Sequence, residues 1–71
     1  GELLDMVVAP GHKNDGLYIK DISLPKRSVI ATVLRENEVL TANGDLKLSS
    51  GDRVLVFTHA EEVNEIRTIF Q

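Results

Sequence analysis

The sequence of 71 residues has no cysteine, no long apolar run and no concentration of positive charge. Without cysteine, a disulfide framework and a thiolate metal site are both excluded. The apolar segments are far shorter than the ~20 residues that a membrane-spanning helix needs, and no signal-peptide pattern opens the chain. These absences predict a soluble domain, and we expect it in the cytoplasm.

The charge pattern excludes one class of partner. Eleven acidic and eight basic residues give a formal net charge of −3, and the longest basic run is Lys26-Arg27. A nucleic-acid surface needs a concentrated positive patch. We therefore expect no contact with nucleic acid, and interpret Lys26-Arg27 as a solvated pair or as a contact to the acidic surface of a partner.

The sequence shows no apparatus for catalysis. No serine lies in a Gly-x-Ser-x-Gly setting, no carboxylate pair can be assigned to a pocket, and His12 and His59 are far apart in sequence. A Gly-x-Gly-x-x-Gly run is also missing, so no dinucleotide cofactor is expected. We expect a protein that is not an enzyme and has no metal site and no cofactor.

A chain of this length forms one domain with a marginal core. It buries only about 60% of the surface that its unfolded form exposes. Small domains without disulfides or metals often gain the missing burial by pairing with a copy of themselves. The 42% of hydrophobic residues is consistent with an apolar face left over for such a contact. These properties favour a homodimer.

Apolar runs and turn residues predict a small α+β sandwich of order β-α-β-β-β-α, with one face of the sheet covered by two helices. The expected strands and helices are Leu3–Ala9, a short helix Gly16–Ser23, Val29–Leu34, Glu38–Thr41, Arg53–Phe57 and an amphipathic helix that carries Val63, Ile66 and Phe70.

Three local patterns support this assignment. Val29–Leu34 is apolar on both sides, which is typical of a central strand that is buried on both faces. Glu36-Asn37 predicts a two-residue hairpin turn, with Asn37 able to adopt the left-handed conformation. The run Thr58-His59-Ala60-Glu61 has the form of a capping box for the last helix.

Two charged pairs allow more than one interpretation. Asp45 and Asp52 each follow a glycine, and they either bond local backbone amides in a turn or bind a cation. Arg35 and Arg53 lie at the ends of apolar strands. They either hold an anionic ligand together or pair with acids such as Glu38 or Asp52.

Taken in order, these segments resemble a known family. Gly16–Pro25 is similar to its short helix ending in Leu-Pro, and Val29–Arg35 to its central strand with a closing Arg. The stretch from Asn43-Gly44-Asp45 to Gly51-Asp52-Arg53 is similar to its paired Gly-Asp turns. The resemblance covers Leu3 to Phe70 and identifies the chain as a member of the TrkA C-terminal domain family, also called the C-terminal domain of regulators of potassium conductance.

In the resembled family, the short helix and the adjoining strand edge form the homodimer contact, and an effector binds between the two copies. Carried over to matching positions, the resemblance implies a ligand-binding and dimer-interface set of Ile19, Ile22, Leu24, Ser28, Val29 and Ile30. Composition alone allows the apolar members to be core residues instead. Relatives specialised for cyclic di-AMP show Asp-Ile-Arg and an Asn where this chain has Ser23-Leu24-Pro25 and Val29. We therefore expect weak binding of that nucleotide or none.

The resemblance implies a ligand-sensing, dimerising regulatory module of a potassium channel, a potassium uptake system or a cation antiporter. Its partners would be a second copy, a membrane-embedded transporter or channel subunit in the same or a separate chain, and a small-molecule or ion effector. The alternative is a module that only dimerises a larger transporter or transcription regulator and has no ligand of its own. In either case we expect residues 1–71 to be a single domain excised from a larger protein at the cytoplasmic side of the membrane.

Overall fold

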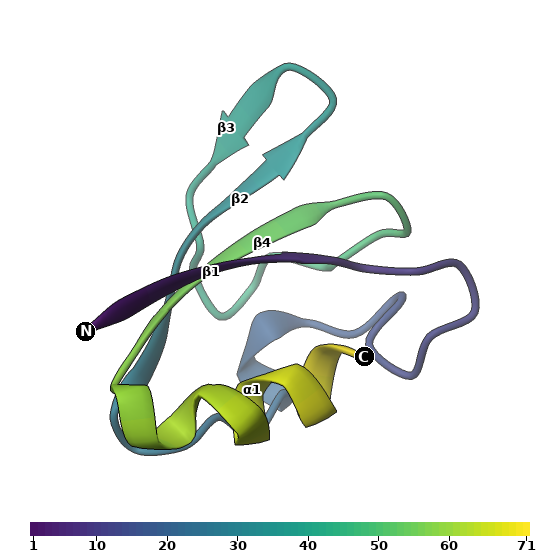
Figure 1. Cartoon of the computed structure of the whole chain (residues 1–71). Coiled ribbons are helices and arrows are strands. Elements are labelled where there is room, and N and C mark those ends of the chain that lie inside the picture. The colour runs from purple at the N-terminus through teal and green to yellow at the C-terminus, as the bar shows by residue number, and fades with distance from the viewer.

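The computed structural model describes residues 1–71 and shows a four-stranded antiparallel sheet with its helices on one side (Figure 1). The elements are β1 (Glu2–Val7), the 3-10 turn η1 (Ile19–Asp21), β2 (Ser28–Arg35), β3 (Glu38–Leu40), β4 (Arg53–Thr58), the 3-10 turn η2 (Ala60–Glu62) and helix α1 (Val63–Phe70). The strand order is β1-β4-β2-β3. The predicted α+β architecture is confirmed, and no helix is long and apolar enough to cross a membrane.

The core lies between the sheet and α1. Alternate residues of β1 and β4 point toward the helix, and α1 contributes Ile66 and Phe70, which are one turn apart and therefore share a face. The buried apolar side chains are Leu4, Met6, Val8, Ile30, Val33, Leu48, Val54, Val56, Ile66 and Phe70. One face of each strand thus packs against the core.

Strand β2 is central, as predicted, but the expectation that both of its faces are buried is wrong for the single chain. Only Ile30 and Val33 are buried, although they are three residues apart. The register shifts between Ile30 and Thr32, so a bulge turns both Ala31 and Thr32 away from the core. The opposite face of this strand carries Val29, which is 57% exposed.

The predicted helix Gly16–Ser23 is reduced to the single turn η1. Gly16 has a φ of 90°, and Tyr18 and Ile22 on either side of the turn are extended, so helical hydrogen bonding cannot propagate. The carboxylate of Asp15, before this turn, accepts a hydrogen bond from the backbone amide of Gly11 and closes the preceding loop.

Two other local predictions need correction. The left-handed residue of the β2–β3 turn is Glu36, with a φ of 55°, and not Asn37. The helical segment after β4 is capped by the His59 side chain, which accepts a hydrogen bond from the backbone of Glu61. Thr58 belongs to β4 and is buried, so its hydroxyl is used elsewhere.

Candidate functional site

The six residues predicted as a ligand-binding and dimer-contact set lie in different environments. Ile30 is buried in the core of the single chain. Ile19, Ile22 and Leu24 are partly buried and pack against that core. Ser28 is half-buried, and Val29 is the member of the set that is largely exposed. The surface of the segment is therefore formed mainly around Val29.

Val29 belongs to an apolar row that crosses three strands. It pairs with Phe57 on β4, and Phe57 pairs with Leu3 on β1. Directly paired side chains lie on the same face of a sheet. Phe57 and Leu3 are 51% and 61% exposed. The predicted segment thus borders an apolar surface; the composition predicted such a face, but no sequence pattern placed Leu3 and Phe57 on it.

A chain of hydrogen bonds fixes Ser28. Its hydroxyl donates to the Glu62 carboxylate at 2.9 Å and lies 2.5 Å from the hydroxyl of Thr58. Because the one hydroxyl hydrogen of Ser28 points to Glu62, Thr58 donates to Ser28 and not to the His59 carbonyl, which is 3.3 Å away. The start of β2 is therefore tied to the end of β4 and to η2.

The same carboxylate also holds the backbone that precedes β2. Glu62 Oε1 accepts from the Arg27 backbone amide at 3.0 Å, and the backbone amide of His59 donates to the Arg27 carbonyl at 3.3 Å. Arg27 and Glu61 add an exposed ion pair at 3.7 Å. The connection between the predicted effector segment and α1 thus depends on Glu62, a residue that sequence reasoning missed because no local motif signals a contact 35 residues away in the chain.

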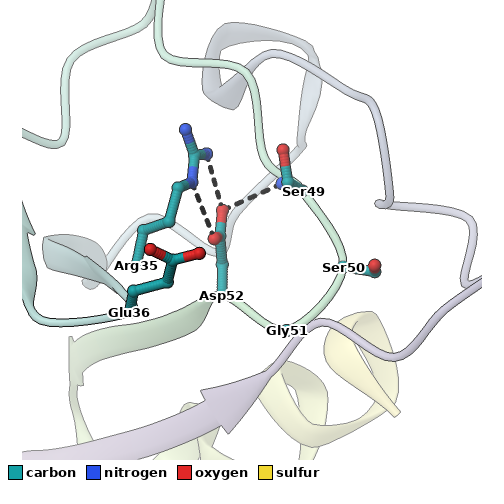
Figure 2. A pocket seen from close by; sticks show the side chains of 6 residues that line it. All are labelled: Arg35, Glu36, Ser49, Ser50, Gly51 and Asp52. Atoms are coloured by element: carbon teal, nitrogen blue, oxygen red, sulfur yellow. Dashed lines mark hydrogen bonds and ion pairs between the residues drawn. The ribbon is translucent and has the colours of Figure 1, made fainter.

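A polar hollow of about 260 Å³ lies at the other end of the sheet (Figure 2). Its lining residues are Arg35, Glu36, Ser49, Ser50, Gly51 and Asp52. Arg35 and Asp52 form a two-point ion pair, with Nε to Oδ1 at 2.9 Å and Nη2 to Oδ2 at 2.8 Å. The buried Asp52 carboxylate also accepts from the Ser49 backbone amide at 2.8 Å. The hollow is therefore built around a satisfied ion pair.

The contacts of Asp52 stabilise its charged form. The hydrogen bonds from Arg35 lower the pKa of Asp52, burial opposes this shift, and the Ser49 amide adds to the lowering. Arg35 Nη2 also donates to the Lys47 carbonyl at 2.8 Å. These contacts support the interpretation of Asp52 as a turn residue that bonds local amides and pairs with Arg35.

The two arginines do not form a shared anion site. Arg53 pairs with Leu34, the residue before Arg35, so the side chains of Arg35 and Arg53 lie on opposite faces of the sheet. Arg53 forms its own ion pair with Asp5, which lowers the pKa of Asp5 mainly through the side-chain hydrogen bond. Each guanidinium is thus neutralised by a separate carboxylate.

The histidines have structural contacts. His12 accepts a hydrogen bond from the Asn14 backbone amide at 3.1 Å, and His59 caps η2. Asn14 is itself buried and donates to the carbonyl of Ile69 at 2.8 Å, which fixes the first loop to the end of α1. No group of three or more His, Asp or Glu side chains is placed to share a metal ion.

Comparison with known proteins shows which family this chain is similar to. The family model of the TrkA-C domain matches residues 3–71. The Trk system potassium uptake protein TrkA homolog of Archaeoglobus fulgidus is 36% identical over 69 residues, which cover 97% of this chain and 16% of that protein. TrkA of Halomonas elongata is 37% identical over 57 residues, which cover 79% of this chain and 12% of that protein.

A solved structure described as an RCK domain with cda has the same fold. It superimposes with a TM-score of 0.83 and 21% sequence identity, and the superposition covers 100% of both chains. The chain spans only 16% and 12% of the lengths of the two potassium uptake proteins above. The family match extends over nearly all of residues 1–71, and the chain therefore belongs to the TrkA-C domain family.

Proposed function

We propose that this chain is the ligand-sensing and dimerising regulatory module of a potassium uptake system, a potassium channel or a cation antiporter. The observation that carries this proposal is the TrkA-C match over residues 3–71. The similar regions of the potassium uptake proteins are likewise a small part of longer chains. In this proposal, residues 1–71 act as one domain of a larger protein at the cytoplasmic side of the membrane. Their role is regulation and not catalysis.

The proposed mechanism is a change in the relation between two copies when an effector binds between them. Within one copy, the hollow at Arg35 and Asp52 is lined by no hydrophobic side chain. A site between copies would instead use the surface from Leu24 to Val29, which includes the exposed side chains of Lys26 and Arg27. Ile30 belongs to the core of the single chain, and Ile19 and Ile22 pack against that core.

A thermal-shift screen tests this proposal. The ligands are nucleotides, cyclic dinucleotides including cyclic di-AMP, and mono- and divalent cations. A ligand at 100 times its dissociation constant should stabilise the folded chain by about 2.7 kcal/mol. We expect Val29→Lys to abolish the shift, because Val29 is exposed and the substitution leaves the core intact. Thr68→Lys on the exposed side of α1 is the matched control and should keep the shift.

The alternative is a module that dimerises without a ligand. A screen in which no ligand shifts the melting temperature of the chain would support this alternative and reject ligand sensing.

A further inference from the structure

We propose that Asn43 is a modification site, at which the backbone of the next residue, Gly44, converts the side-chain amide into a carboxylate. The reactants are the Asn43 side chain, the Gly44 backbone nitrogen and water. No enzyme, effector or second copy takes part. The product is a turn between β3 and β4 that carries a new negative charge and, in one of its two forms, a longer main chain.

The residue after each asparagine decides where this reaction can occur. The backbone nitrogen of that residue has to approach the asparagine Cγ, and a side chain on the same residue hinders the approach. Glycine has no side chain and the widest conformational freedom. Of the four asparagines in the chain, Asn43 is the one followed by glycine, and the others are followed by Asp15, Glu38 and Glu65.

The turn holds the two reacting groups beside each other. The Leu46 backbone amide donates to the Asn43 carbonyl at 3.1 Å, which closes a β-turn. The Asp45 backbone amide donates to Asn43 Oδ1 at 2.9 Å. This second bond keeps the side-chain carbonyl of Asn43 over the Gly44 peptide. Asn43 is also exposed, so water reaches the turn.

The hydrogen bonds of the turn favour the attack. When the Gly44 nitrogen attacks Cγ of Asn43, negative charge develops on Oδ1. The Asp45 amide already donates to this oxygen, and a donor that points at developing charge lowers the barrier. The Gly44 amide donates to no acceptor in the protein, so its nitrogen is free to react.

The reaction has two steps, and nothing is oxidised or reduced. In the first step, the Gly44 nitrogen forms a bond to Cγ of Asn43, the bond between Cγ and Nδ2 breaks, and Nδ2 leaves as ammonia with the Gly44 amide proton. In the second step, water adds to one of the two carbonyl carbons of the ring, and the bond from that carbon to the Gly44 nitrogen breaks. Addition at Cγ gives aspartate. Addition at the main-chain carbon gives isoaspartate, in which the main chain runs through the former side chain.

Isoaspartate at position 43 would loosen the contact between this turn and η1. The Gly44 carbonyl accepts from the Lys20 amide at 3.1 Å, and the Leu46 carbonyl accepts from the Ile19 amide at 2.9 Å. A Cβ on Gly44 would lie 3.1 Å from Cβ of Lys20, so the two segments approach closely. An additional carbon in the main chain displaces both acceptors. We therefore expect the amides of η1 to become less protected.

Peptide mapping of the folded chain, incubated at mildly alkaline pH, tests the site. Mass spectrometry after chromatographic separation distinguishes asparagine, aspartate and isoaspartate at each position. We expect Asn43 to convert roughly tenfold faster than Asn37, which is also exposed but is followed by Glu38. The rate should rise with pH, because the attacking nitrogen has to lose its proton.

Asn43→Gln is the matched variant for this measurement. Its amide is one carbon farther from the Gly44 nitrogen, so residue 43 should remain unchanged. Circular dichroism verifies that the parent and the variant stay folded during the incubation. If Asn43 converts in urea but stays intact in the folded chain, the fold protects the turn and the modification site is rejected. Conversion of Asn37 as fast as that of Asn43 would also reject it.

Hydrogen exchange tests the consequence for η1. Anion-exchange and reversed-phase chromatography isolate the isoaspartate form, which carries one more negative charge than the parent. We expect faster exchange at the Ile19 and Lys20 amides in this form, and unchanged protection in the centre of β4. Asn43→Asp adds the charge without lengthening the main chain, and it should exchange like the parent. Equal exchange at Lys20 in the isoaspartate form and in the parent would overturn the proposed loosening.

Discussion

At the scale of single residues, the Arg35–Asp52 pair is the polar contact on which the local structure most depends. Asp52 is 1% exposed and joins β2, the Ser49–Asp52 turn and the strand that follows. Replacing Asp52 by Asn removes the charge and leaves the guanidinium without its acid. We expect a loss of about 1.5–3 kcal/mol in the free energy of unfolding, the range for hydrogen bonds to charged groups. Urea denaturation at pH 7 measures it.

The same residue predicts a dependence on pH. Because the folded-state pKa of Asp52 is lowered, its stabilising contribution is complete above the unfolded value of about 3.9 and is lost as the pH falls through the folded value. The parent should therefore lose stability below about pH 4, and Asp52→Asn should lose less over that range. Asp21→Asn, at an exposed position, controls for the removal of one carboxylate. Equal pH profiles for the parent and Asp52→Asn would contradict this account of the pair.

Gly51 gives a second prediction at the residue scale. Its φ is 87°, and a Cβ placed there would meet no atom within 4 Å. Any loss on substitution would thus come from the backbone conformation and not from a clash. We expect Gly51→Val to lower the free energy of unfolding by about 1–3 kcal/mol, and Gly51→Asn to lower it less, because Asn adopts positive φ more readily. Equal losses for Val and Asn would show that the conformation is not the cause.

At the scale of the elements, Glu62 connects the segment before β2 with the start of α1. Glu62→Ala removes the acceptor of the Arg27 amide and of the Ser28 hydroxyl. We expect faster hydrogen exchange at the Arg27 amide and unchanged protection in the centre of β4. Glu61→Ala is the control, since the side chain of Glu61 forms only an exposed ion pair with the Arg27 side chain. Unchanged exchange at Arg27 in Glu62→Ala would show that this contact does not hold the segment.

Some of these elements could be predicted from the sequence, and others could not. The strands and α1 follow from apolar runs and from Val63, Ile66 and Phe70, and the structure contains them at nearly the predicted positions. The short helix was predicted wrongly because the positive φ of Gly16 and the extended backbone of Tyr18 and Ile22 cannot be inferred from apolar runs and turn residues. The bulge in β2 also left no signal, because Ala31 and Thr32 suit either face of a strand. The contacts of Glu62 and Asn14 depend on long-range geometry, which periodicity does not report.

At the scale of the whole molecule, the chain is a sheet with one covered and one open face (Figure 1). Its 71 residues provide a core of ten buried apolar side chains, all on the covered side. The TrkA-C family region is a small part of longer proteins. A sheet with one uncovered face suits a regulatory domain of this kind, because the uncovered face is a surface for association. We expect two copies of the chain to form the functional unit.

Sedimentation equilibrium of the unmodified chain from about 10 μM to about 1 mM measures this association. The chain mass is 7.8 kDa, and we expect the weight-average mass to rise with concentration toward twice this value. A folded species that stays at 7.8 kDa throughout the range would contradict the account.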